Sequence, residues 1–252
     1  MNKPVIKIVT ALFIGAAVTP AFERDMLNLE TPSGLEAGNG VIELQHRFKG
    51  PVDYDPAGTI LGMKGGANVH LGFRYCPWRR LEFRPALTFG QKEYTLGASY
   101  SLRFTRFAET KFGVEFFSYD VPEIKDRRQN FFYNLSFQGE PILGVISPAL
   151  VVGYDGYEER VGTGLGVAVG FDREGLFKHI ALIGEYYPVF ARDEERTGPE
   201  DCFAAGVEAQ TYGHHFALLV GNSSQIGTRR LMLGADTNDL YLGFNIYRLI
   251  EF

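Results

Sequence analysis

The sequence predicts an all-β fold, a transmembrane antiparallel up-and-down β-barrel of about twelve strands. The segment from Asp239 to Phe252 alternates apolar with mixed side chains and ends on an aromatic residue, as outer-membrane barrels do. Runs of about ten residues with the same period of two recur along the chain. The chain is 14% aromatic and has 30 glycines, which indicate barrel strands better than its mean hydropathy of -0.08.

The amino terminus has the pattern of a secretory signal peptide. Lys3 and Lys7 precede an apolar run from Ile8 to Val18, and Thr19-Pro20-Ala21 forms a small-residue cleavage site. The run is shorter than the roughly 20 apolar residues that a membrane-spanning helix needs. We therefore expect a signal peptide at 1–21, a periplasmic or lumen-plugging segment at 22–39 and the barrel at 40–252, in the bacterial outer membrane.

The strands follow in order after residue 39, each supported by alternation of apolar and polar side chains. The alternation is clearest in 66–75 and 93–104. It is weakest in 144–154, because Pro148 cannot donate a hydrogen bond to a neighbouring strand. The expected strands are 40–49, 66–75, 80–89, 93–104, 110–119, 129–138, 144–154, 161–171, 178–187, 202–212, 214–221 and 239–252.

The connections between these strands alternate between long and short, as expected for outer loops and periplasmic turns. With the first strand rising from the periplasm, only the short outer connection 90–92 breaks the pattern. A soluble barrel or sandwich would show the same period of two. The signal peptide, the strand length, the alternating connections and the terminal Phe252 together favour the membrane barrel.

Composition and cysteine usage argue against several other classes. A net charge of -5 and a pI near 5.6 are unlike nucleic-acid-binding proteins, which carry basic patches. Cys76 and Cys202 fall at opposite rims of the expected barrel, so we predict that they are not bonded to each other. No histidines or cysteines show metal-ligand spacing, and no cofactor is implied.

Both ends of the predicted barrel resemble an uncharacterised family of bacterial outer-membrane proteins described as a membrane-bound β-barrel domain. The resemblance lies in Gly40 to Phe48, which ends in His-Arg-Phe, in His215-Phe216 through Gly221-Asn222-Ser223, and in Asn238 to Arg248. This chain departs from the family pattern at Lys49, Leu240 and Tyr247, where the family has Gly, Trp and Ser. The resemblance implies the fold and the location, and it assigns no activity.

If the Leu, Phe and Tyr positions face lipid, the opposite face of each strand lines the lumen and is charged. Charges facing lipid at mid-depth would cost about 2–4 kcal/mol for Arg or Lys, so the lumen is their favoured location. The predicted lumen-lining residues are Glu43, Arg47, His70, Arg74, Arg80, Glu82, Arg84, Arg103, Lys111, Glu115, Glu185 and Glu208.

Two functions fit this charged lumen, of which the first is the predicted one and the second is the alternative. One is a narrow channel or ligand-binding barrel for small solutes, with a basic wall facing Glu185 and Glu208. The other is a closed structural or partner-docking barrel whose interior is bridged by ion pairs. The expected partners are outer-membrane lipid and lipopolysaccharide, the barrel-assembly machinery through the strand that ends in Phe252, and a small solute.

A lipid-modifying enzyme is the third and weakest hypothesis, and we expect no enzymatic activity. A hydrolase of this kind needs Ser beside His. His214 and His215 lie at one end of their strand and Ser223 and Ser224 at the other, roughly 30 Å apart at about 3.3 Å per residue. These residues therefore cannot meet within that strand, although another strand could supply a partner.

Two further features need a structural explanation. The even spacing of Gly162, Gly164, Gly166 and Gly170 predicts a lumen stripe without side chains, which could admit a loop, a ligand or a tight bend, rather than a nucleotide-binding loop. His46 has lipid-facing parity, so either it lies at the headgroup boundary or a bulge reverses the parity.

Overall fold

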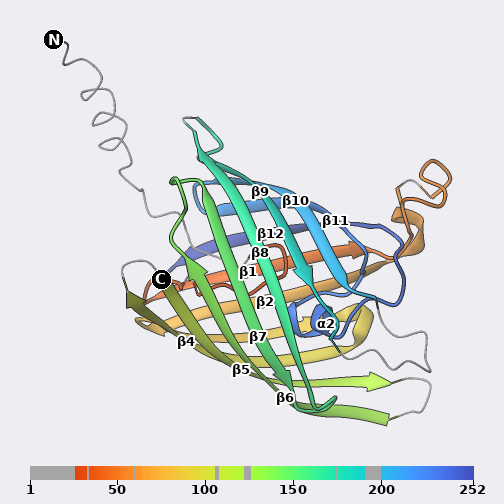
Figure 1. The fold of residues 1–252 in the computed structure, drawn as a ribbon, viewed down its shortest axis with the longest axis horizontal. Helices are drawn as coiled ribbons and strands as arrows, with labels where there is room; N and C mark the ends of the chain where they lie inside the picture. Colours follow the sequence, from red (N-terminus) through yellow and green to blue (C-terminus); the bar gives the residue numbers. More distant parts are fainter. Residues whose placement is uncertain are drawn as a thin grey trace.

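Twelve antiparallel strands close into one barrel in the computed structural model (Figure 1). The structure describes residues 26–32, 34–59, 61–105, 108–121, 126–173, 175–190 and 200–252. The predicted signal peptide lies outside these residues. Three short helices, η1 (Met63–Gly65), η2 (Phe89–Gln91) and α2 (Thr228–Met232), lie in connections. The strands are β1 (Asn39–Phe48), β2 (Ala67–Trp78), β3 (Leu81–Thr88), β4 (Glu93–Thr105), β5 (Ala108–Val121), β6 (Asp126–Gly139), β7 (Ile146–Asp155), β8 (Arg160–Asp172), β9 (His179–Tyr187), β10 (Cys202–Thr211), β11 (His214–Gly221) and β12 (Tyr241–Glu251).

The predicted fold class is confirmed, because each expected strand has an observed counterpart whose ends agree within about three residues. Each strand pairs with its sequence neighbours, and β1 pairs with β12 to close the ring. The β6–β7 pairing ends at Ala149, next to Pro148, although Pro148 still lies opposite Val167 of β8. The missing N–H of proline explains why the pairing with β6 stops there.

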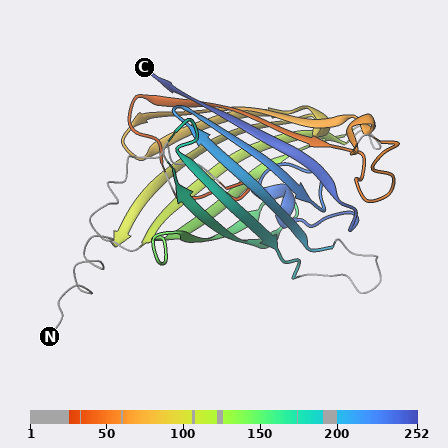
Figure 2. The ribbon, with the colours of Figure 1, turned by 90° about the horizontal axis from the view of Figure 1, so that it is seen from above.

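The two ends of the barrel differ in their connections. At the end where Asn39 pairs with Glu251, which we call the inner end, the turns between strands are mostly short. The opposite end, where Gly221 lies beside Tyr241, carries the long connection 222–240 with α2. Figure 2 shows that the segment before β1 and the helix α2 both lie within the ring of strands rather than outside it.

The outer surface of the ring is apolar and the inner surface carries charge. Leu218 and Leu96, which the sequence assigns to lipid, are 71% and 59% exposed, whereas Arg74 and Lys111 are fully buried. His46 keeps its outward parity without a bulge, with its ring stacked 4.8 Å from that of Phe244. An arrangement with apolar residues outside and charges inside is the reverse of a soluble protein and fits a barrel surrounded by lipid.

No helix of the described residues has the length and apolar character to cross a bilayer. Cys76 and Cys202 are both buried and free, on β2 and β10.

An arginine on the outer surface tests which face meets lipid. We expect Leu218→Arg to lower the free energy of unfolding in phospholipid vesicles by about 2–4 kcal/mol, because a charge near mid-depth loses its hydration. Leu143→Arg is the matched control: Leu143 is 89% exposed in the turn before β7, and its replacement should cost less than about 1 kcal/mol. Guanidinium titration of both variants gives the two values. Equal effects would contradict the orientation.

Candidate functional site

The inner wall of the barrel has a charged half and an apolar half. On β1 to β5 the buried inward side chains include Glu43, Arg74, Glu82 and Lys111. On β7 to β11 most of them are small or apolar, although Asp155, Glu185 and Glu208 are charged. The small and apolar ones are Ala149, Val151, Ala181, Ile183, Ala204, Ala217 and Leu219. A wall of alanines and glycines leaves space inside the ring, and an apolar wall gains stability when that space is filled with apolar groups.

The segment before β1 fills part of this space. We call residues 26–38 the plug segment. Met26, Leu27 and Leu29 are buried in one cluster with Val151, Ile183 and the other apolar wall residues. A side chain on Gly166 would collide with the plug, since its Cβ would lie 2.5 Å from the sulfur of Met26. Within the glycine stripe of β8, Gly166 therefore makes room for the plug segment, whereas Gly164 faces Tyr187 and Gly170 faces His179.

Glu185 of β9 is the main polar anchor of the plug segment. Its carboxylate accepts hydrogen bonds from the backbone N–H groups of Asn28 and Leu29, at 2.8 and 2.9 Å, and from the Asn28 side-chain amide at 3.0 Å. The Tyr187 hydroxyl donates a further bond at 3.2 Å. Hydrogen bonds from several donors are what allow a carboxylate to be buried.

Other wall residues hold the plug segment along its length. Arg47 donates to the side-chain oxygens of Asn28 and Asn245, both at 2.8 Å, and the Asn245 amide donates to the Leu27 carbonyl at 2.7 Å. Nearer the inner end, the Leu35 N–H donates to Glu82 at 2.7 Å and the Ser101 hydroxyl to the Pro32 carbonyl at 2.8 Å. These bonds satisfy the backbone of a segment that has no strand neighbour.

The connection 222–240 enters the lumen from the opposite end, and we call it the lumen loop. Its helix α2 places Arg229 between Glu93 and Asp155, at 2.7 and 2.9 Å, and Arg230 also pairs with Glu93. Burial lowers the pKa of Arg229, but the two carboxylates raise it more, so the guanidinium stays charged. The central guanidinium carbon of Arg229 lies 3.8 Å from the centre of the Phe117 ring, which makes a cation–π contact.

The plug segment and the lumen loop meet inside the barrel at Thr228. The Thr228 hydroxyl donates to the Asn28 carbonyl at 2.7 Å and accepts a hydrogen bond from the Glu30 N–H at 3.1 Å. Gly162 gives the lumen loop its space, because a Cβ there would lie 2.6 Å from the Cβ of Met232. The two inserts thus fill the lumen from both ends and are bonded to each other.

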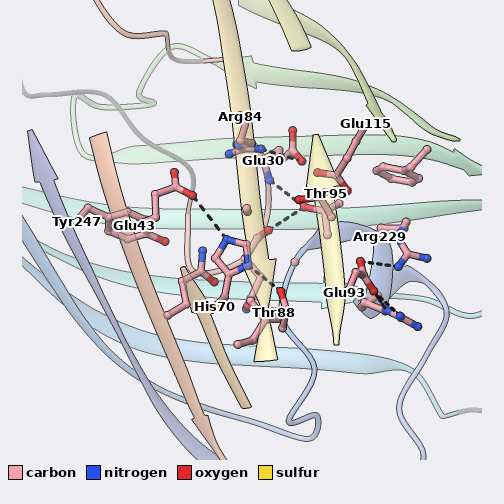
Figure 3. Close-up of a pocket in the computed structure, with 18 residues that line it drawn as sticks. Glu30, Glu43, His70, Arg84, Thr88, Glu93, Thr95, Glu115, Arg229 and Tyr247 are labelled. Atoms are coloured by element: carbon pink, nitrogen blue, oxygen red, sulfur yellow. Dashed lines mark hydrogen bonds and ion pairs between the residues drawn. The ribbon is translucent and has the colours of Figure 1, made fainter. Parts of the chain in front are cut away.

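A small polar cavity remains between the inserts and the charged wall (Figure 3). Its volume is about 60 Å³, enough for only a few water molecules. Glu30 of the plug pairs with Arg84 at 3.0 Å across it, and His70 contacts Thr88 at 2.9 Å. Glu43, Glu93, Glu115, Arg229 and Tyr247 also line it (Figure 3). A solute as large as a monosaccharide does not fit this space.

The structure separates the predicted lumen residues into three groups. Glu43, His70, Arg84 and Glu115 line the cavity. Arg47 and Glu185 bind the plug segment, as does Glu82. The third group consists of Arg74, Lys111 and Glu208. Arg74 pairs with Glu43 at 2.6 Å, Lys111 lies 3.8 Å from Glu30, and Glu208 lies 3.5 Å from His215.

The placement of Arg80 and Arg103 differs from the prediction. Arg80 lies in the turn between β2 and β3 rather than in a strand, with a φ of 74°. The Arg103 side chain is 59% exposed and pairs with Glu109 at 2.6 Å. Both residues have inward parity, but they sit where the strands reach the inner rim, so the period of two no longer determines what they contact.

Several residues that fill the lumen were not among the predicted ones. Asn28 and Glu30 belong to the plug segment, and Thr228, Arg229 and Arg230 belong to the lumen loop. Neither segment has strand periodicity, so parity says nothing about them. The signals that could have found them are the length of the 222–240 connection and the apolar Met26-Leu27-Asn28-Leu29 run in an otherwise polar segment.

The histidine and serine residues considered for catalysis lie apart along β11. His215 lies buried beside Glu208 at the inner end of the strand, and Ser223 lies beyond the other end, where its hydroxyl accepts a hydrogen bond from the Gln225 N–H. Among the residues that the structure describes, no group of three or more His, Cys, Asp or Glu side chains has a metal-binding arrangement.

Filling the space over Gly166 tests the plug. We expect Gly166→Leu to displace Met26, to speed amide hydrogen exchange in residues 26–32 and to lower the free energy of unfolding by about 1–3 kcal/mol. Gly184→Leu is the matched control, because a Cβ on Gly184 of neighbouring β9 meets only Val167, at 3.8 Å. Exchange measured by mass spectrometry should change in the first variant alone. Unchanged exchange in Gly166→Leu would show that the plug does not occupy this position.

Several solved structures are similar to this chain at low sequence identity. No curated protein sequence matches the chain. Among solved structures, LpxR from Salmonella typhimurium is 12% identical over 84% of this chain and 100% of its own, with a TM-score of 0.46. The KdgM porin is 13% identical over 82% and 98%, with a TM-score of 0.49, and the NanC porin 6% identical over 84% and 99%, with a TM-score of 0.48.

The family resemblance drawn from the sequence is confirmed by a family model. The model matching residues 163–250 is described as "Membrane bound beta barrel domain (DUF5777)". These residues run from β8 to the end of β12 and include the lumen loop and the anchor Glu185. With its closed ring of twelve strands and its apolar outer surface, this chain is a transmembrane β-barrel.

Proposed function

We propose that this protein is an outer-membrane β-barrel that is closed to solutes at rest and acts as a structural or partner-docking element. The observation that carries the proposal is the filled lumen: the plug segment and the lumen loop meet at Thr228, and the cavity between them and the charged wall has a volume of about 60 Å³. Displacing both inserts would expose the apolar cluster around Leu27, Leu29 and Met232 to water. Burial of that cluster therefore favours the closed state.

A narrow channel for small solutes is the second candidate, and the polar side of the lumen favours it. Part of the plug is held by hydrogen bonds and ion pairs, such as Glu30 with Arg84, which water can replace. A plug that moves aside would leave the charged wall of β1 to β5 facing the lumen. Transport would then require displacement of the plug and would not be constitutive.

The outer membrane is the proposed location because the barrel matches a membrane-bound family and the sequence begins with a signal-peptide pattern. Phe252 closes the last strand and is 78% exposed, with its ring edge-on to Tyr75 at 5.7 Å. An exposed terminal aromatic side chain is accessible to the barrel-assembly machinery, our proposed partner during insertion. Lipopolysaccharide is the proposed neighbour at the opposite rim. We expect no lipid hydrolysis by the purified protein.

Planar-bilayer recording tests the closed state. We expect the folded wild-type protein to give no steady current, because the lumen is filled at both ends. Glu185→Ala removes the carboxylate that receives both plug N–H groups, so this variant should show intermittent current steps. Leu143→Ala, in an exposed turn, is the control and should behave as wild type.

A steady, ion-selective current from the wild type would overturn the closed barrel in favour of the channel. Silence from both wild type and Glu185→Ala would mean that loss of this anchor does not open the lumen. Heat-dependent migration in gels shows in each case that the barrel has folded.

A further inference from the structure

A basic pair lies on the outer face of the barrel near its inner end. Arg248 of β12 and His214 of β11 face each other in the strand register. One guanidinium nitrogen of Arg248 lies 3.0 Å from Nδ1 of His214, and the Arg248 side chain is exposed. In the last strand, Arg248 is the only charged residue at the positions that otherwise carry lipid-facing apolar side chains.

The surroundings of this pair are apolar and turned to lipid. Ile42, opposite Arg248 on β1, is 46% exposed, and Phe216, stacked on the His214 ring at 5.8 Å, is 41% exposed. The turn at Tyr212 and Gly213 directly precedes His214, so the pair lies where the apolar band ends. A cation at this depth can reach the headgroup layer, and Tyr212, 85% exposed, is a residue type enriched there.

Two other basic side chains at the inner rim, Arg103 and His179, have carboxylate partners. Arg103 pairs with Glu109 at 2.6 Å, and His179 pairs with Asp172 at 2.9 Å. The ion pairs within the described ranges include none between Arg248 and a carboxylate, and its polar contact there is His214. Unlike Arg103 and His179, Arg248 faces lipid without a carboxylate partner among the described residues.

A groove lies beside Arg248 and offers space for a headgroup. It has a volume of about 300 Å³ and is lined by Tyr212, Gly213, Arg248, Leu249, Ile250 and Glu251. Glu251 is three residues beyond Arg248, so in an extended strand its side chain has the opposite parity. A guanidinium can bind two oxygens of a phosphate at once, and basic residues near a membrane surface attract anionic lipid.

We propose that Arg248, assisted by His214, binds the phosphate of an anionic phospholipid in the membrane leaflet at the inner end of the barrel. The acyl chains would then lie over Ile42 and Phe216, and Tyr212 would lie at headgroup level. Inorganic phosphate offers the same oxygens without acyl chains, so the lipid should be the preferred source. The proposal is independent of whether the lumen is open or closed.

Native mass spectrometry of the full folded protein in detergent, titrated with phosphatidylglycerol, tests this site. We expect Arg248→Gln to weaken the first binding event about fivefold, the effect of one basic side chain near a membrane surface. Arg103→Gln is the matched control, since it removes an inner-rim arginine that already has a carboxylate partner. It should leave the first binding event within about twofold of wild type. Glu251→Gln, which removes the acidic side chain of the groove, should strengthen binding.

Any one of four outcomes would overturn the proposal. Arg248→Gln could bind phosphatidylglycerol as tightly as wild type. Arg103→Gln could lose as much affinity as Arg248→Gln, which would indicate a general charge effect. Diacylglycerol, which lacks phosphate, could be retained as well as phosphatidylglycerol, or millimolar inorganic phosphate could displace the lipid. Gel migration before and after heating confirms folding of each variant.

Discussion

The buried carboxylate of Glu185 determines how the lumen is filled. It receives four hydrogen bonds, three of them from Asn28 and Leu29. A carboxylate without these donors would be costly to bury, and the two backbone N–H groups would lack a partner without it. Because the donors are adjacent in the chain, the carboxylate fixes the position of the plug. Leu27 and Leu29 then contact the apolar wall, and the Asn28 carbonyl reaches Thr228.

The plug has two faces that match the two halves of the barrel wall. Its leucines pack on the alanine and glycine side, from β7 to β11. Its Glu30 lies near Arg84, Lys111 and Asn134 on the other side. The charged half of the wall thus gains an acidic partner and the apolar half gains side chains that fill it. A segment with only one of these characters would leave either unpaired charges or voids.

The period of two predicted much of this structure, because parity follows directly from the geometry of an extended chain. It gave the strands, the lipid-facing side of Leu96 and Leu218 and the inward side of Arg74 and Glu185. It failed for Arg103, since an inward residue at a rim meets solvent instead of the lumen. It gave no information on Asn28 or Arg229, whose positions depend on contacts with residues far away in sequence. The glycines of β8 came closest to revealing the inserts, because their even spacing indicated space in the lumen without showing what fills it.

The long sequence separations of the plug contacts affect the order in which the structure can form. The most distant partners of Asn28 and Leu27 are Glu185, Thr228 and Asn245, which lie 157, 200 and 218 residues further along the chain. Closing such large loops carries an entropic cost that local hairpins avoid. The first described residues of the chain therefore dock only once β9, β12 and the lumen loop are in place, because these supply their distant partners.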